Sequence, residues 1–148
     1  MSRGVLTAGL LVVMVVVLGC GSGGPQGPPR KQTFKVTGKV TVDGQAPTMP
    51  IQVTCHVLSG NDPSNPFVPT IEVKPDGALV FGTYVAGDGL PPGEYALTFS
   101  SREFNLMKRE YDGADLFKGR YSQLNQAPVK FAVSNQPVDI GTVDLTTK

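Results

Sequence analysis

The chain has 148 residues, and its 13 Lys and Arg against 12 Asp and Glu give a formal net charge of +1. A near-neutral chain has no basic face with which to displace counterions from phosphates, so we predict no nucleic-acid partner. The 18 Gly, the 13 Pro and the absence of Trp are typical of a turn-rich single domain and favour an all-β fold over a helical one.

The N-terminus has the pattern of a secretory signal. Arg3 is the only charge before an apolar run that extends from Gly4 to Leu18. This run is shorter than the roughly 20 apolar residues that a membrane-spanning helix needs, and it ends in small residues. We therefore predict a signal peptide over 1–19. An uncleaved anchor helix is the alternative.

The end of the apolar run carries a more specific motif. Val17-Leu18-Gly19-Cys20 resembles the lipobox of bacterial lipoproteins, in which the cysteine sulfur receives a diacylglyceryl group and a peptidase cuts just before that cysteine. The resemblance implies lipidation of Cys20. Gly21, in place of Asp, resembles the pattern that permits export to the outer membrane. Two or more acyl chains would anchor the protein firmly, since each buried CH₂ contributes about 0.8 kcal/mol.

A polar segment follows the cysteine. Residues 21–32 read GSGGPQGPPRKQ and have almost no apolar side chains, so they cannot form a core. Glycine makes the first part flexible, and Pro28-Pro29 stiffens the second. We predict a Gly/Pro-rich tether over 20–33 and a folded domain over 34–148.

The domain has the pattern of short strands. Apolar and polar side chains alternate from Phe34 to Val42, which predicts a half-buried strand, and Asp43-Gly44 then favours a turn. Similar patterns predict further strands at 51–58, 67–73, 78–85, 94–100, 128–133 and 138–145. A helical turn is expected only within 104–117. Seven strands separated by turn signals predict an antiparallel β-sandwich of about 110 residues.

The order of motifs resembles a known family. The stretches are FKVTGKVTVDGQAP, VKPDGALVFGTYVAGDGLPPGEYALTF and FKGRYSQLNQAPVKFAVSNQPVDIGTVDL. Over 34–145 they resemble small bacterial lipoproteins with a carboxypeptidase regulatory-like, or transthyretin-like, β-sandwich. The resemblance implies a fold and a location but hardly any chemistry, because related domains act as accessory or adhesive modules. The GDGLPPG turn reads as structural, with a ligand loop as the alternative.

The sequence offers little for catalysis. His56 is the single histidine, and neighbours in a strand point to opposite faces, so a dyad with Cys55 is geometrically disfavoured. We expect Cys55 to be a small buried apolar residue and His56 to lie on the surface. Transthyretin-like folds include a purine-pathway hydrolase whose site resembles several histidines, an arginine and a C-terminal Tyr-Arg-Gly-Ser. This chain has one histidine and ends in DLTTK, so we predict no enzyme activity and no cofactor.

Metal sites are not predicted either. Zinc needs three or four Cys, His or carboxylate ligands, and the sequence has no such cluster. Calcium needs only oxygen ligands, and Glu110, Asp112 and Asp115 lie close together. Their spacing is not that of an EF-hand loop, and acidic loops are usually solvated, so we predict no metal.

The most distinctive segment is Ser101–Asp115, which reads SREFNLMKREYDGAD. It either covers an open end of the sandwich or contacts a partner, since loops on such scaffolds carry function. We expect a non-enzymatic envelope-structural role, or binding of protein or polysaccharide, with the membrane reached through the lipid. The alternative is a small-ligand or carbohydrate carrier using 101–127. Its candidate binding residues are Phe104, Tyr111 and Tyr121, although the absence of Trp weakens sugar stacking.

The two cysteines are predicted to be unrelated. A Cys20–Cys55 disulfide would close a loop of about 35 residues, worth roughly 3–4 kcal/mol in the chain-entropy model. An acylated sulfur is unavailable for that bond. We therefore predict that Cys20 carries the lipid anchor and that Cys55 packs as a small apolar residue in the core. The sequence does not indicate an oligomeric state.

Overall fold

The computed structural model describes residues 27–148, which form nine β-strands and one turn of 3₁₀ helix. The all-β fold class is confirmed. The signal peptide predicted at 1–19 and the lipid site predicted at Cys20 lie outside the described residues. Within 27–148, no helix has the length and apolar character required to span a bilayer.

The strands are divided among three sheets. The first has four strands in the order β3-β4-β1-β9, namely Thr70–Val73, Ala78–Gly82, Val36–Val42 and Val138–Leu145. The second has three strands in the order β2-β5-β8, namely Gln52–Ser59, Gly93–Ser100 and Val129–Val133. The third is a hairpin of β6 (Glu103–Asn105) and β7 (Glu110–Asp112).

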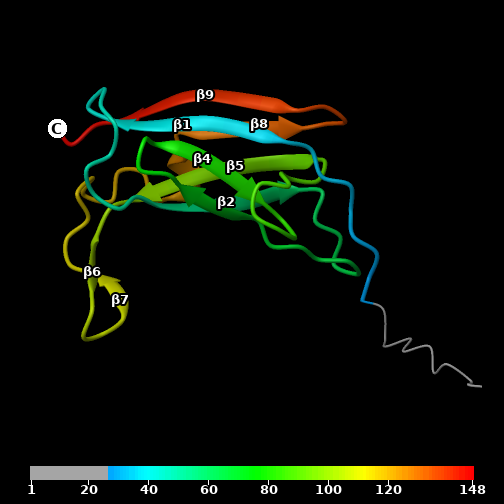
Figure 1. Ribbon diagram of the computed structural model, residues 1–148, viewed down its shortest axis with the longest axis horizontal. Coiled ribbons are helices and arrows are strands. Elements are labelled where there is room, and N and C mark those ends of the chain that lie inside the picture. The colour runs from blue at the N-terminus through cyan, green and yellow to red at the C-terminus, as the bar shows by residue number, and fades with distance from the viewer. Residues whose placement is uncertain (1–26) are drawn as a thin grey trace, which may run out of the picture.

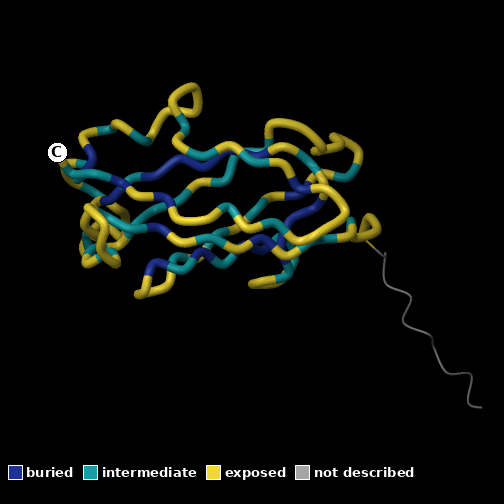
Figure 2. The backbone as a smooth tube through the Cα atoms, turned by 90° about the horizontal axis from the view of Figure 1, so that it is seen from above, coloured by how far each residue is buried: buried dark blue, intermediate teal, exposed yellow. Residues whose placement is uncertain are grey.

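The two larger sheets pack face to face around one core (Figure 1). Alternate side chains of each strand point inward, as period-two patterning requires. The first sheet contributes Val40, Phe81 and Leu145, and the second contributes Tyr95 and Leu97, all at most 1% exposed. The buried residues run along the strands, and the exposed ones gather in the loops (Figure 2).

One strand pairing differs from the antiparallel sandwich predicted from the sequence. β1 and β9 are parallel, from Val36 opposite Val138 to Val42 opposite Leu145. A parallel pair needs a long crossover, and here almost the whole domain lies between the two strands, so local turn signals could not reveal it. The register shifts at Gly38. A Cβ there would lie 2.4 Å from Cγ1 of Ile140, so only glycine fits beside this bulge.

Segment boundaries also differ in two places. The strand predicted at 67–73 begins at Thr70, and Phe67 instead fills the core at 6% exposure. The helical turn expected within 104–117 is wrong, because this segment contains the β6–β7 hairpin. The only helical turn among the described residues is η1 (Leu124–Gln126). Cross-strand pairing of two aromatic residues favours the hairpin over a helix.

The GDGLPPG segment is a structural turn that starts β5. The Asp88 carboxylate accepts the backbone N–H groups of Thr83, Tyr84 and Val85 at 2.7, 3.1 and 3.2 Å. Tyr95 is fully buried, and its hydroxyl donates to the carbonyl of Pro91 at 2.7 Å. The turn therefore fixes both the loop between β4 and β5 and the first inward side chain of β5.

The N-terminal segment contacts the sandwich from Pro29 onward, before Phe34, where the folded domain was predicted to begin. The side-chain amide of Asn65 donates to the carbonyl of Pro29 at 2.9 Å, and the backbone N–H of Lys31 donates to the Tyr84 hydroxyl at 2.8 Å. The Lys31 ammonium lies 4.9 Å from the centre of the Phe67 ring. We call this the tether end. The β6–β7 hairpin lies at the opposite, distal end (Figure 1).

Replacement of Asp88 tests the turn. Asp88→Ala leaves three backbone donors without their acceptor, and we expect it to lower the free energy of unfolding by about 2 kcal/mol. The measurement is urea unfolding followed by circular dichroism. The matched control is Asp76→Ala, whose carboxylate accepts one N–H, from Ala78 at 3.0 Å. Equal losses for the two variants would contradict this role of Asp88.

Candidate functional site at the distal end

The β6–β7 hairpin presents apolar side chains to solvent. Leu106 and Met107 at its tip are 80% and 94% exposed, while Phe104 and Tyr111 are about half exposed. The rings of Phe104 and Tyr111 face each other across the two strands, with centroids 5.2 Å apart and an interplanar angle of 66°. Exposed apolar side chains grouped in this way mark interaction surfaces on soluble domains.

Local polar contacts hold the hairpin turn. The side-chain oxygen of Asn105 accepts the N–H groups of Met107 and Lys108 at 3.0 and 3.2 Å. The Lys108 ammonium pairs with the Asp112 carboxylate at 2.5 Å, which lowers the pKa of that carboxyl. Arg109 takes a positive φ of 56°, which closes the turn. The apolar tip is thus held by these local polar contacts and not by burial.

A partly buried network joins the hairpin base to the sandwich. The Asp115 carboxylate accepts the N–H groups of Ser101 and Gly119, each at 2.8 Å. Ser101 is fully buried, and its hydroxyl donates to the carbonyl of Pro50 at 3.0 Å. This network places the hairpin beside the loop that leads into β2.

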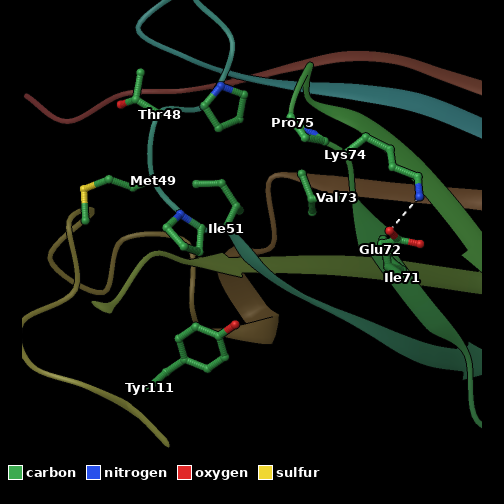
Figure 3. A pocket seen from close by; sticks show the side chains of 11 residues that line it. Thr48, Met49, Ile51, Ile71, Glu72, Val73, Lys74, Pro75 and Tyr111 are labelled. Atoms are coloured by element: carbon green, nitrogen blue, oxygen red, sulfur yellow. Dashed lines mark hydrogen bonds and ion pairs between the residues drawn. The ribbon is translucent and has the colours of Figure 1, made fainter. Parts of the chain in front are cut away.

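A groove of about 500 Å³ lies between that loop, β3 and the hairpin (Figure 3). Its walls combine apolar side chains with a larger share of polar surface, which includes the ion pair between Glu72 and Lys74 at 2.6 Å. The lining residues are Pro47, Thr48, Met49, Pro50, Ile51, Ile71, Glu72, Val73, Lys74, Pro75 and Tyr111. The groove and the hairpin thus share Tyr111 and form one continuous surface.

The structure brings two of the three sequence-derived binding candidates together. Phe104 and Tyr111 share the hairpin, whereas Tyr121 packs on Phe117 with ring centroids 5.4 Å apart. The Tyr121 hydroxyl also accepts the N–H of Thr146 at 3.1 Å, so it serves the fold. Sequence reasoning missed the groove walls. The only local sign of the groove walls is Ile51, an apolar residue that follows Pro50. Its neighbours across the groove come from β3, about 20 residues later in the sequence, so no local pattern connects them.

Cys55 and His56, the two side chains considered above for a catalytic dyad, both make contacts within the sandwich. Cys55 is partly buried and packs against the core, and burial raises the pKa of its thiol to about 12. Nε2 of His56 lies 2.9 Å from the hydroxyl of Thr98. At neutral pH the thiol is protonated and is a poor nucleophile. Among residues 27–148, no three His, Cys, Asp or Glu side chains gather as metal ligands would.

The buried thiol predicts a pH dependence. The folded state holds the Cys55 proton more tightly than the unfolded chain, whose thiol has the ordinary pKa of 9.0. Its contribution to stability is therefore complete below pH 9.0 and is lost as the pH rises toward 12. Burial raises the pKa of the Tyr95 hydroxyl in the same direction.

We expect the free energy of unfolding to fall more steeply for the wild type than for Cys55→Ala between about pH 8 and pH 11. Tyr95 is common to both proteins and contributes a decline in each, which is smaller in the variant because the charge of Cys55 also raises the pKa of Tyr95 in the wild type. Urea unfolding at a series of pH values measures both slopes. Parallel slopes would contradict a buried thiol.

Comparison with known proteins adds no assignment to this geometry: no protein-family model, no curated protein and no solved structure matches the chain.

Proposed function

We propose that this protein is a lipid-anchored, non-enzymatic binding module of the bacterial envelope, held to the outer membrane through Cys20. Its distal end binds a protein or a polysaccharide of the envelope. The observation that carries the proposal is the position of the apolar hairpin and groove, which lie opposite the end where the N-terminal segment meets the sandwich. A surface placed there is presented away from the anchor.

The anchor is supported by the lipobox-like motif and by the path of the chain. The first contacts with the domain begin at Pro29. The residues between Cys20 and Pro29 span at most about 30 Å even when fully extended. A lipid on Cys20 would therefore keep the tether end near the bilayer and leave the distal end toward the periplasm or the exterior.

Binding is favoured over catalysis by the chemistry of the distal end. The hairpin carries exposed aliphatic and aromatic side chains beside the charges of Lys108 and Arg109. Such a mixture of an apolar centre and a charged rim is typical of interfaces between proteins. The buried thiol of Cys55 lies away from this surface, on β2, and cannot supply a nucleophile to it.

We also propose that the domain is a carboxypeptidase regulatory-like, or transthyretin-like, β-sandwich. The motifs quoted above support this, as does the packing of a four-stranded sheet on a three-stranded sheet. Fold alone does not determine function, so the binding role rests on the distal surface.

Intact-mass analysis of membrane-extracted protein tests the anchor. We expect a mature chain that begins at Cys20 and carries a diacylglyceryl group on its sulfur. Cys20→Ser should keep the signal peptide and lack the lipid, whereas the control Cys55→Ser should be processed and lipidated normally. A mature N-terminus at any other residue, or an unmodified sulfur, would overturn the anchor.

The alternative function is a small-ligand or carbohydrate carrier using 101–127. It is favoured by the half-exposed rings of Phe104 and Tyr111, because sugars stack on exposed aromatic faces. Tyr121 fits it less well, since its ring packs on Phe117.

A glycan array separates the carrier from a module that binds protein. A module that binds protein should show no specific sugar binding. Specific binding that is lost in Tyr111→Ala would favour the carrier instead. Tyr121→Ala serves as a second variant, whose unfolding temperature should be measured because that ring contributes to packing.

A further inference from the structure

We propose that the tether end of the sandwich lies against the bilayer, with two exposed valines in the interfacial region and two cations beside the lipid phosphates. This inference rests on the proposed function, because it needs the lipid on Cys20, and it adds a membrane contact made by the folded domain itself. It is carried by the exposure of Val68 and Val85 and by the positions of Arg30 and Lys31 beside them.

Two neighbouring loops present apolar side chains at the tether end. Val68, in the loop between β2 and β3, is 76% exposed, and Val85, in the loop between β4 and β5, is 59% exposed. A Cβ at Gly82 would lie 2.6 Å from the carbonyl oxygen of Val85 and 3.1 Å from Oγ1 of Thr70, so the two loops lie side by side. Both are at the end where the N-terminal segment meets the sandwich (Figure 1). The two valines therefore belong to one exposed surface.

Each of these valines has a cation next to it. The Arg30 guanidinium lies 5.3 Å from the centre of the ring of Tyr84, the residue just before the second valine. The Lys31 ammonium lies over the ring of Phe67, the residue just before the first valine. The N–H of Lys31 donates to the Tyr84 hydroxyl at 2.8 Å and fixes this arrangement. Exposed apolar side chains flanked by Lys and Arg are typical of segments that bind a membrane interface.

The two cations are available to lipid phosphates. The ion pairs within residues 27–148 involve other lysines, so neither Arg30 nor Lys31 pairs with a carboxylate there. The carboxylates of the two loops are held by donors of their own loops. Asp62 accepts the N–H and the hydroxyl of Ser64 at 2.8 and 2.7 Å, and Asp88 accepts three backbone N–H groups. Lys and Arg side chains at the membrane surface strengthen binding to anionic lipids.

The position of this surface selects the bilayer as its partner. Because the residues between Cys20 and Pro29 span at most about 30 Å, a lipid on Cys20 holds the tether end beside the membrane. Two valines and two cations are far fewer than the roughly 20 residues a side of a standard protein interface. They suffice as a second membrane signal, since an anchored domain meets the bilayer at a high effective concentration.

This contact would also set the orientation of the domain. The β6–β7 hairpin lies at the end of the sandwich opposite the two loops (Figure 1). A tether end held against the bilayer by both the lipid and the loops would therefore point the hairpin away from the membrane. The lipid alone, on a glycine-containing tether, would leave that orientation free.

The test places a fluorophore at each end of the anchored protein. The full, lipidated chain is reconstituted in vesicles of phosphatidylethanolamine and phosphatidylglycerol, with Cys55→Ala so that an introduced cysteine is the only free thiol. Nitrobenzoxadiazole is attached at Val68→Cys or Val85→Cys, and Met107→Cys, also at an exposed position, is the distal control. A second set of vesicles contains a lipid with a nitroxide on the upper part of its acyl chain, which quenches labels that enter the interface.

We expect the nitroxide lipid to quench the labels at positions 68 and 85 by roughly twofold or more and to leave the label at position 107 unchanged. Arg30→Gln combined with Lys31→Gln keeps the backbone hydrogen bonds of the segment but removes both charges, so it should reverse most of this quenching. The matched control, Lys108→Gln combined with Arg109→Gln in the hairpin, should leave the quenching as it is.

Co-flotation with the vesicles measures the anchor in the same samples. A chain that floats while its labels at positions 68 and 85 stay unquenched would overturn the membrane contact and leave the anchored binding module standing. Equal quenching at position 107 would also overturn the contact. So would a blue shift without quenching at position 68 or 85, which would indicate a second copy of the chain on this surface. A chain that does not float would overturn the anchor and, with it, the contact.

Discussion

The burial of β5 between its neighbours and the opposite sheet is the constraint on which the rest of the structure depends. Tyr95, Leu97 and Phe99 face the core and are at most 1% exposed, and Ala96 on the other face is also fully buried. β5 is the central strand of its sheet, so β2 and β8 both take their register from it. Its first residues follow the turn held by Asp88, and its last residue leads into the hairpin. One strand therefore connects the tether end to the distal surface.

Much of this fold could be predicted from local pattern. Alternation of apolar and polar residues located β1 and β9 closely, because each of these strands buries one face and exposes much of the other. The same alternation located β2 and β5, although β5 is buried on both faces. The same pattern placed Cys55 on the inward face of β2. The two shortest strands, in the hairpin, escaped prediction because three residues are too few to distinguish a period of two from one of 3.6.

The remaining features depend on contacts that are distant in the sequence. The parallel pairing of β1 with β9 and the seating of Lys31 on the Phe67 ring join segments that no local motif connects. The contribution of the hairpin to the groove likewise depends on Ser101 and Asp115, which join the hairpin base to Pro50. The aromatic pair of the hairpin, Phe104 and Tyr111, was predicted from the sequence as part of the candidate surface. The groove wall formed by β3 was not predicted, because the position of a strand at the edge of a sheet depends on the strand order, which local patterns do not show.

The parallel pair of β1 and β9 has a consequence for the order of events in the cell. β1 is among the first strands to be synthesised, but its neighbour on one side is the last, about a hundred residues later. Until that segment emerges, one edge of β1 is unpaired and the inward side chains of Val143 and Leu145 are missing from the core. The sandwich can close only after β9 has left the ribosome. For the export proposed above, such a delay would keep the chain unfolded and competent for translocation.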